Sequence, residues 1–480
     1  MYVYFKDDIR NIDQLSVKRG LSIETLMENA GRSLFEEIVK VIHKNHTICI
    51  LAGTGNNGGD GIVLARYLKI NGYQVSLCFP VGTPKTEPAL AHLHYYEASG
   101  YDVVEWPTNR VYDVIVDALL GIGSRPGLQG QLMNVIRWAN EQHTLRIAID
   151  IPTGISADVG YANEAFLAHY TFCLHGLKPS ALLEPSAAYY GEWKSLDIGL
   201  PQNGLWKVWT EEDVKQTTPI RSPFSHKGTY GTGLLLAGSD EMPGSALLAA
   251  FGAMRSGIGK LTIGTTKFTA SVLTPRLPEA TYMTDGLQRV AKGDIANTYR
   301  GAAIGPGIED QNITEQAIKT LFTMPMPVVL DAGALWKREY PKRSHVTVLT
   351  PHPGEFSRIT DTSVADIQAN RLSLASDYAK KHGVIVVLKG TYTVIAFPDG
   401  KGVINTTGNS GLAKGGTGDT LTGILLAFLC TYEHQQEAVA NAVYIHGLCA
   451  DEWANDYAKV SMLASDISNM LPKVLKRFQQ

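Results

Sequence analysis

Residues 47–70 read TICILAGTGNNGGDGIVLARYLKI. The apolar run Thr47–Ala52 predicts a buried strand, the glycines after it predict a loop, and Ile62–Ile70 predicts a helix. Gly53–Gly58 matches the GxGxxG pattern of dinucleotide-binding loops. The acidic residue that usually ends the second strand of such folds is missing, because that strand runs into Cys78–Val81. The stretch therefore predicts a parallel α/β fold with an incomplete NAD fingerprint.

Strands and helices alternate on both sides of this stretch. In the first half, strands are expected at 74–80, 112–118, 145–151 and 168–174, and helices at 22–42, 87–99 and 131–142. In the second half, strands are expected at 233–237, 260–265, 301–304, 327–331, 345–349, 384–389 and 393–396, and helices at 245–256, 419–432 and 437–455. The pattern predicts a Rossmann-like α/β fold with a doubly wound parallel sheet in the first half, and a second α/β fold in the second half.

The chain is too long for one core, because 480 residues exceed the roughly 250–300 at which single cores stop growing. The polar, proline-containing segment Thr210–Ser225 separates the two patterns. We therefore expect two domains, residues 1–208 and residues 209–480.

Composition excludes several classes of protein. The net charge is −3 and Lys and Arg do not cluster, so neither nucleic acid nor a membrane surface is an expected partner. The five cysteines are scattered without a CxxC pair, which argues against disulfides and zinc. No apolar run is long enough to span a bilayer or to form a signal peptide, so we expect a cytoplasmic enzyme.

Three acidic residues follow predicted strands of the first half: Asp60, Asp117 and Asp150. Ligands of open parallel sheets bind beyond the carboxyl ends of the strands, so this edge is the candidate site. Asn57, Asp117 and Thr153 offer only oxygen donors, which suit a hard cation such as potassium. Asp150 is then left as a candidate acid–base residue. The alternative is that Asp60 simply caps its helix in a tight turn.

Motifs of the first half resemble the YjeF N-terminal domain, the family of NAD(P)H-hydrate epimerases, over nearly all of residues 1–208. They are GNNGGDG (55–61), VDALLGIG (116–123), AIDIPTG (148–154) and LHGLKPS (174–180). The resemblance implies that the hydrated cofactor touches Asn56, Asn57, Gly58, Gly59, Asp60, Gly121, Ile122, Gly123, Ser124, Arg125, Pro126, Gly127 and Asp150. It also implies a potassium ion on Asn57, Asp117 and Thr153. Ser180 stands where the family has glycine, and no role is assigned to Lys178–Ser180.

The chemistry suits one positioned carboxyl group. The hydrate carries a hydroxyl on the ring carbon beside the ring nitrogen. Protonation of this hydroxyl lets the nitrogen lone pair expel water, and addition of water to the other face inverts the centre. A single carboxyl could act first as acid and then as base, and Asp150 is our candidate.

The second half carries Gly415-Gly-Thr-Gly-Asp419 at the start of a helix. Glycines there let backbone amides surround an anion, and the helix dipole favours negative charge. Asp419 would repel a phosphate unless it takes a proton from an attacking hydroxyl, which is the arrangement of ribokinase-like small-molecule kinases. The alternative is that Asp419 is an ordinary helix cap.

Other loops fit a nucleotide site. Residues 389–393 follow a predicted strand and could line phosphates or ribose. His352 lies in a Pro/Gly loop at a strand end, where a substrate contact is favoured over the alternative of a buried, fully hydrogen-bonded histidine.

Motifs of the second half resemble the ADP-dependent NAD(P)H-hydrate dehydratase domain from about 220 to 475. They include HKGTYG (226–231), LTPHPGEF (349–356), LKGTYTVI (388–395) and NSGLAKGGTGDTLTG (409–423). The resemblance implies that the hydrate touches Ser245, Gly307, His352 and Asp419, and that ADP touches Lys389, Gly390, Thr391, Tyr392, Thr393 and Gly418. Magnesium is expected with the nucleotide, and Ser245 stands where the family has alanine.

The two resemblances together predict a bifunctional repair enzyme for hydrated NADH and NADPH. The first half would interconvert the R and S hydrates, and the second would dehydrate the S hydrate and release phosphate and AMP. The family also implies a homo-oligomer. A plain kinase of a vitamin precursor or sugar with an attached nucleotide-binding domain is the competing hypothesis, and a non-catalytic cofactor-binding protein is a second one.

Overall fold

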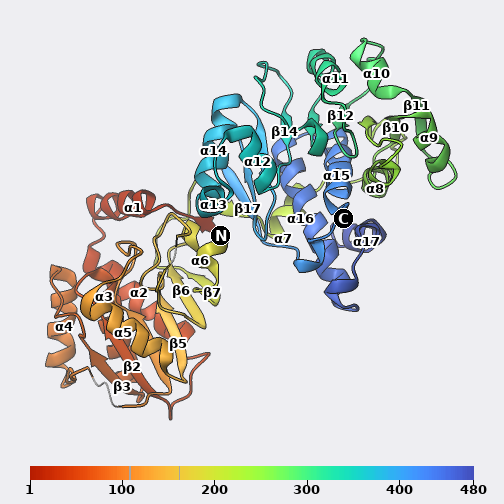
Figure 1. The fold of residues 1–480 in the computed structure, drawn as a ribbon. Coiled ribbons are helices and arrows are strands. Elements are labelled where there is room, and N and C mark those ends of the chain that lie inside the picture. Colours follow the sequence, from red (N-terminus) through yellow and green to blue (C-terminus); the bar gives the residue numbers. More distant parts are fainter. Residues whose placement is uncertain (107–109, 162, 480) are drawn as a thin grey trace. The chain divides into compact units, whose positions relative to one another are not determined.

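The computed structural model describes residues 1–106, 110–161 and 163–479. The chain divides into two compact units (Figure 1). Unit 1 comprises Met1–Trp206 and Gln368–Asn370, and unit 2 comprises Lys207–Ile367 and Arg371–Gln480.

Unit 1 is an α/β fold. Its elements are β1 (Tyr2–Val3), α1 (Lys6–Lys18), α2 (Ile23–Ile38), β2 (Thr47–Ala52), α3 (Asn56–Ile70), β3 (Gln74–Cys78), α4 (Glu87–Ala98), β4 (Val114–Ala118), α5 (Gly130–Glu141), β5 (Leu145–Ile149), β6 (Tyr170–Leu174), η1 (Pro179–Leu182), α6 (Glu184–Ala187) and β7 (Glu192–Leu196). The sheet order is β3-β2-β4-β5-β6-β7, and every neighbouring pair is parallel. The doubly wound sheet predicted from the sequence is confirmed.

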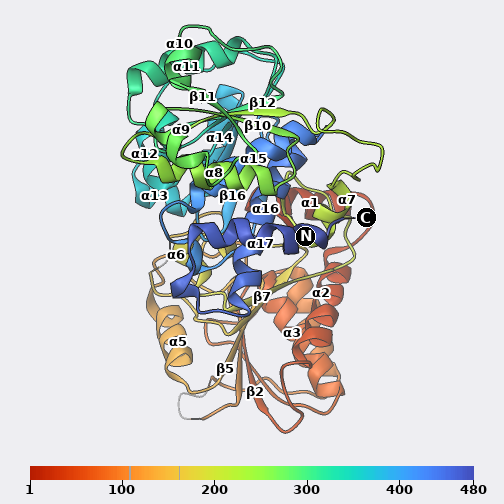
Figure 2. The same cartoon turned by 90° about the vertical axis from the view of Figure 1, so that its right-hand side faces the viewer.

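Alternating side chains of β2 enter two cores. Ile48 and Ile50 belong to the core shared with α2 and α3, whereas Cys49 and Leu51 belong to the core shared with α5. Figure 2 shows α2 and α3 on one side of the strands and α5 on the other. Both faces of the sheet are therefore buried, as a parallel sheet requires.

Helix α3 begins at Asn56, six residues before the predicted start at Ile62. A β-carbon on Gly58 would lie 2.0 Å from the carbonyl oxygen of Gly53, and one on Gly59 would lie 2.3 Å from the sulfur of Met27. These glycines thus let the first turn pack tightly against its neighbours. The predicted loop is therefore limited to residues 53–55, and residues 56–61 are helix instead. The N-cap is Gly55, so the alternative of Asp60 as a cap is wrong.

Unit 2 is also α/β. Its elements are β8 (Trp206–Val208), α7 (Glu211–Thr217), β9 (Thr232–Leu236), α8 (Pro243–Arg255), β10 (Lys260–Thr265), α9 (Lys267–Leu273), β11 (Thr281–Thr284), α10 (Gly286–Ala291), β12 (Gly301–Ile304), α11 (Gln311–Thr323), β13 (Val328–Leu330), η2 (Ala332–Ala334), β14 (Thr347–Leu349), α12 (Pro353–Thr360), α13 (Val364–Ala369), α14 (Arg371–His382), β15 (Ile385–Leu388), β16 (Thr393–Ala396), β17 (Gly402–Asn405), η3 (Ser410–Leu412), α15 (Thr417–Thr431), α16 (Gln435–Ala454), η4 (Lys459–Ser461) and α17 (Ala464–Lys476).

The sheet of unit 2 contains the run β17-β16-β15-β14-β13-β12-β9-β10-β11. Neighbours from β15 to β11 are parallel, and β16 is antiparallel to both β15 and β17. Helices α8 and α15 pack very closely, because a β-carbon on Gly423 would lie 1.8 Å from the carbonyl oxygen of Ala249. This contact fixes the start of α15 beside that of α8.

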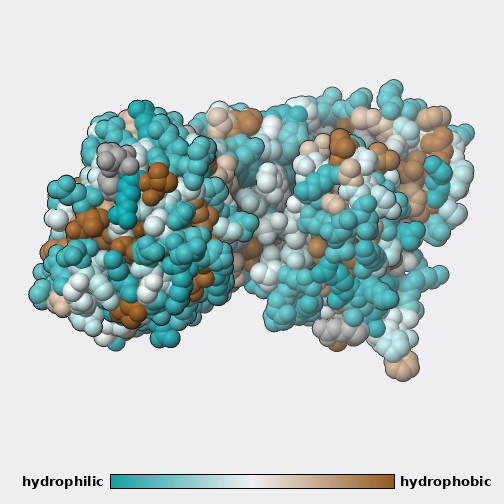
Figure 3. Space-filling view, turned by 90° about the horizontal axis from the view of Figure 1, so that it is seen from below, coloured by the Kyte–Doolittle hydropathy of each residue, from teal (hydrophilic) through white to brown (hydrophobic). Residues whose placement is uncertain are grey.

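The surface seen in Figure 3 is mostly hydrophilic, with scattered apolar patches on each unit. Among the described residues, no helix combines the length and apolar character needed to cross a membrane.

Candidate functional site

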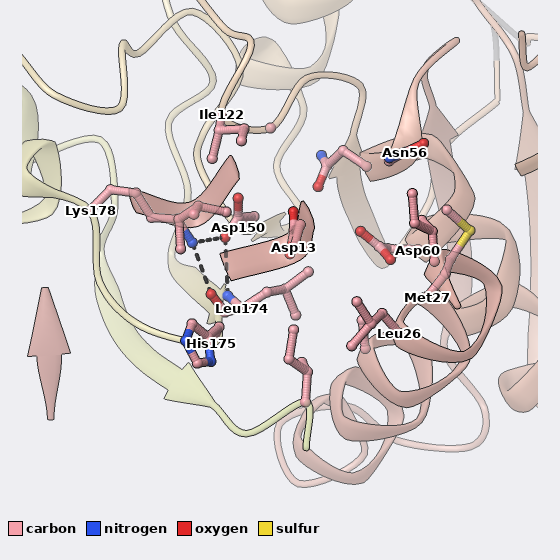
Figure 4. Close-up of a pocket in the computed structure, with 16 residues that line it drawn as sticks. Asp13, Leu26, Met27, Asn56, Asp60, Ile122, Asp150, Leu174, His175 and Lys178 are labelled. Atoms are coloured by element: carbon pink, nitrogen blue, oxygen red, sulfur yellow. Dashed lines mark hydrogen bonds and ion pairs between the residues drawn. The ribbon is translucent and has the colours of Figure 1, made fainter. Parts of the chain in front are cut away.

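A cavity of about 170 Å³ opens in unit 1 (Figure 4). It lies beyond β2 and β4, where the strand order reverses and the loops after the two strands diverge. The sheet edge contributes Asn56, Asn57, Asp60, Gly121, Ile122, Asp150, His175 and Lys178, and helices α1 and α2 contribute Asp13, Leu26 and Met27. The predicted contacts Gly58, Gly59 and Gly123–Gly127 are not among the described residues that line it.

Asp150 and Lys178 form a buried ion pair in this cavity. Lys178 also donates hydrogen bonds to the carbonyl oxygens of Leu174 at 2.9 Å and Gly176 at 3.2 Å. The second donor to Asp150 is the Leu174 amide at 3.1 Å (Figure 4). The carboxylate of Asp150 is therefore held by one cation and one amide.

Both strands that supply these groups end in sharp three-residue turns. Asp150 has φ 67°, and the Ile151 amide donates to the carbonyl of Ile149 at 2.8 Å. His175 has φ 64°, and the Gly176 amide donates to the carbonyl of Leu174 at 2.8 Å. Positive φ at non-glycine residues is strained, and such strain concentrates at functional sites.

Two further carboxyl groups face the same space. Burial raises the pKa of Asp13 to about 6, and the charge of Asp150 adds to the rise. Burial also raises the pKa of Asp60 well above its usual value, with Asp150 and Asp13 adding to it. His175 stays neutral, because burial and Lys178 lower its pKa to about 4.

Asp117 and Thr153, two of the predicted potassium ligands, are hydrogen-bonded to one another. The hydroxyl of Thr153 donates to Asp117 at 2.8 Å, and its amide donates to the other carboxyl oxygen at 2.8 Å. Asp117 is fully buried, and burial raises its pKa to about 6. No cationic side chain pairs with it, and no hydrogen bond joins Asn57 to it, among the described residues. Ser124 points inward, where its hydroxyl accepts from the Gly154 amide at 2.8 Å.

In unit 2, Asp331 forms the centre of a buried cluster at the end of β13. It accepts hydrogen bonds from the hydroxyls of Thr350 at 2.7 Å and Thr422 at 2.8 Å, and from Lys389 at 3.1 Å. Lys389 also lies 3.8 Å from Glu355. The pKa of Lys389 is raised, because Asp331 and Glu355 outweigh the opposing effect of burial.

Asp419 is the third residue of α15. The helix follows Gly416, whose φ of 91° suits glycine, so the alternative of Asp419 as the cap is wrong. Burial raises the pKa of Asp419 to about 6, although a hydrogen bond with Ser245 opposes this rise. A β-carbon on Gly307 would lie 2.8 Å from that of Ser245, and one on Gly418 would lie 3.4 Å from the nitrogen of Lys389. The structure therefore brings the predicted residues Ser245, Gly307, Lys389, Gly418 and Asp419 together.

His352 is exposed rather than buried, so the alternative of a buried histidine is wrong. Its Nδ1 caps α12 by accepting from the amides of Gly354 at 3.0 Å and Glu355 at 3.2 Å. Its Nε2 lies 3.5 Å from Glu355. Gly390, Thr391 and Tyr392 form the turn between β15 and β16, and Thr393 begins β16.

Comparison with known proteins separates the same two halves. Residues 23–180 match the family described as YjeF-related protein N-terminus, and residues 233–473 match the family described as NAD(P)H-hydrate dehydratase. The bifunctional NAD(P)H-hydrate repair enzyme of Moorella thermoacetica is 32% identical over 524 residues, which cover 100% of this chain and 98% of the relative. The chain belongs to the family of bifunctional NAD(P)H-hydrate repair enzymes.

Other members and solved structures agree with this placement. The bifunctional repair enzyme of Escherichia coli is 31% identical over 98% of this chain and 94% of its own length. The solved ADP/ATP-dependent NAD(P)H-hydrate dehydratase of Bacillus subtilis, co-crystallised with ATP and Mg²⁺, is 53% identical, with a TM-score of 0.56, over 57% of this chain and 99% of its own. A ribokinase-like protein of Enterococcus faecalis is 26% identical, with a TM-score of 0.52, over 58% of this chain and 99% of its own. The resemblance to this family and the ribokinase-like fold predicted for the second half are confirmed.

Sequence reasoning missed three residues at these repair-family sites. Lys178 lies in the motif LHGLKPS, where an isolated lysine in an apolar segment was a usable signal for a buried ion pair. Asp331 is the last residue of the predicted strand 327–331 and directly follows the observed strand β13. Asp13 lies far from the other motifs in sequence, and only the folded chain shows that it reaches the cavity.

Proposed function

We propose that this chain repairs hydrated NADH and NADPH. Residues 1–208 interconvert the R and S hydrates, and residues 209–480 use ADP to dehydrate the S hydrate, releasing phosphate and AMP. The observation that carries the proposal is the match to a bifunctional repair enzyme over the whole chain. Each half also contains an acidic residue that could transfer a proton. Asp150 forms an ion pair with Lys178, and Asp419 forms a hydrogen bond with Ser245.

In the epimerase half, the hydrate would occupy the cavity in front of Asp150. Asn56, Asn57, Asp60 and the backbone at Gly121 and Ile122 line this cavity and would orient the ring. Asp150 would protonate the leaving hydroxyl or take a proton from the attacking water. Lys178 fixes the carboxyl in place through its ion pair.

Potassium would be held by Asn57, Asp117 and Thr153. The donor set fits, because all three offer oxygen and because Asp117 is a fully buried carboxyl without a cationic partner among the described residues. A bound cation would supply the missing positive charge.

In the dehydratase half, Asp419 would take the proton of the hydrate's hydroxyl while the terminal phosphoryl group of ADP is transferred to its oxygen. The amides at the start of α15 and the ammonium group of Lys389 would stabilise the charge on that phosphoryl group. Phosphate leaves more readily than hydroxide, and loss of a neighbouring proton then restores the dihydronicotinamide. Magnesium would neutralise charge on the nucleotide phosphates. Among the described residues no group of three or more His, Cys, Asp or Glu side chains is placed to hold a metal.

Absorbance of the dihydronicotinamide tests both halves. Full-length protein receives a mixture of R and S hydrates with ADP or ATP, magnesium and potassium. Wild type is expected to restore all the absorbance, Asp419→Ala none, and Asp150→Ala only the share of the S epimer. If the nucleotide is consumed and a stable phosphorylated product accumulates instead, the competing kinase function replaces this one.

We also expect a homo-oligomer located in the cytoplasm, although these two expectations stay predictions from the sequence. Light scattering of the purified protein would test the first.

A further inference from the structure

Helix α1 places an acidic residue on its inner face. Ile9, Asp13 and Ser16 stand at helical spacing, and Ile9 and Ser16 are both buried. An aspartate at such a position loses hydration, and this is costly unless partners replace the water. No hydrogen bond or ion pair reaches the carboxyl of Asp13 within the described residues. Packing of α1 therefore does not explain why this position carries an acid.

Asp13 instead faces the cavity of unit 1 (Figure 4). The charged or titratable groups that act on it there are Asp150, which follows β5, and Lys178, which follows β6. Asp60 of α3 lies in the same lining, and its own pKa responds to Asp13. His175 lines the cavity as a neutral ring. Three carboxyl groups thus share one space with a single lysine.

Epimerisation through loss and return of water needs two proton transfers, one on each face of the ring. The leaving hydroxyl must gain a proton, and the water that adds to the opposite face must lose one. One carboxyl can do both only if it reaches both faces. Asp150 is anchored by its ion pair with Lys178 and by the Leu174 amide, so its reach is limited.

We propose that Asp13 is the second acid–base residue of the epimerisation and acts on the ring face opposite to that served by Asp150. The inference rests on the epimerase function proposed above. In one direction, Asp13 gives its proton to the hydroxyl, the bond between ring carbon and oxygen breaks, and water leaves as the nitrogen lone pair forms a carbon–nitrogen double bond. Water then adds to the other face, and Asp150 takes its proton. Exchange with solvent water returns a proton to Asp13 and removes the one on Asp150 before the next turnover.

In the reverse direction the two carboxyls exchange roles. Each direction therefore requires the pair Asp13–Asp150 to hold one proton, so both epimers should show the same pH profile. Burial keeps the pKa of Asp13 near 6, within reach of physiological pH, which suits a group that must gain and lose a proton. Burial also raises the pKa of Asp60, which favours the neutral carboxyl and so a hydrogen-bond donor to the substrate.

The test uses full-length protein without nucleotide, so that the dehydratase half is silent. Conversion of purified R hydrate to S hydrate is followed by chromatography between pH 5 and 9, with the uncatalysed rate subtracted. Asp13→Asn is expected to lower kcat by about 10²–10⁴-fold and to remove the fall in rate that wild type shows as pH rises past about 6. Asp13→Glu keeps the carboxyl group. It is expected to retain part of the rate and to show the same decrease in rate at high pH as the wild type.

Asp7→Asn is the matched control, because Asp7 lies on the same helix with a side chain that is 88% exposed. This substitution should leave the rate of epimerisation and its pH profile unchanged. Hydrogen exchange at the strands of unit 1 reports that each variant has folded, and dehydration of the S hydrate reports the same for unit 2. The inference would be overturned if the rate of Asp13→Asn stayed within threefold of wild type. It would also be overturned if the rate were lower but still decreased at high pH as in the wild type. If wild type itself fails to interconvert the epimers, the proposed function fails instead.

Discussion

Both units contain an aspartate–lysine pair at the carboxyl edge of a parallel sheet, yet the two lysines differ. The side chain of Lys178 in unit 1 is 1% exposed, and it is bonded to Asp150 and two backbone carbonyls. The side chain of Lys389 in unit 2 is 22% exposed, and its hydrogen bond is to Asp331. Asp331 in turn has two threonine hydroxyls as further donors.

The difference shows that one kind of ion pair can serve two tasks. All three hydrogens of Lys178 are used within the protein, so this lysine can only fix its carboxylate. Lys389 has hydrogens left and lies near the start of α15, so it can meet an anionic ligand. This difference supports the proposed roles, in which unit 1 holds Asp150 as an acid–base group and unit 2 receives a phosphate.

The largest expected effect comes from removing the enclosed lysine. Lys178→Met leaves the buried Asp150 without its cation, and breaking a buried pair on one side costs about 3–5 kcal/mol. Hydrogen exchange at the amides of β5 and β6, measured by mass spectrometry, would report this loss of local stability.

The exposed Lys194 of β7 serves as the control, because its pair with Glu37 lies at the surface. Lys194→Met should cost less than about 1 kcal/mol. If the two substitutions lowered stability equally, burial of the ion pair of Lys178 would not contribute to stability.

Lys389→Met should act on catalysis instead. The loss of a cation beside the transferring phosphoryl group is expected to lower kcat for dehydration by about 10²–10³-fold, while epimerisation stays unchanged. Stability should fall less than in Lys178→Met, because Asp331 keeps Thr350 and Thr422. Release of phosphate from S hydrate and ADP measures the effect, and the exposed Lys401 supplies the control substitution to methionine. A variant that is unstable but fully active would contradict this assignment.

The sequence predicted both folds because periodicity and glycine loops are local signals. It also placed Asp150 and Asp419 at strand or helix ends, where the structure has them. It failed where a partner is distant in sequence: Asp13 reaches Asp150 only after α1 folds over the sheet edge, and Asp331 meets Thr422 across 91 positions. It also misjudged the start of α3, because glycines that favour loops in isolation here permit close packing.

Potassium would act on a second difference: Asp331 has a lysine partner, whereas Asp117 has none in the part of the chain that the structure describes. Because burial raises the pKa of Asp117 from 3.8 to about 6, the stability that its neutral form contributes is present below about pH 4 and lost as pH rises through 6. At pH 8, potassium at 100 times its dissociation constant should stabilise unit 1 by about 2.7 kcal/mol. Thermal melting in potassium chloride against choline chloride measures this, and Asp117→Asn should abolish the difference. Equal melting temperatures of the wild type in the two salts would show that potassium does not bind at this site.

The smallest expected effect concerns the different partners of the two proposed acid–base residues, Asp150 and Asp419. Asp150 has a lysine in contact, whereas burial raises the pKa of Asp419 to about 6 and the hydrogen bond with Ser245 opposes this rise more than the charge of Lys389 does. A base must be ionised, so kcat/KM for dehydration should fall as pH drops below about 6. Ser245→Ala removes a hydrogen bond to the ionised form and should move this limb upward by about 0.5–1 pH unit, which corresponds to about 0.7–1.4 kcal/mol. The pH profile of phosphate release measures the shift, and the profile for epimerisation should not move. An unshifted limb in Ser245→Ala would contradict the assignment of Asp419 as the base of dehydration.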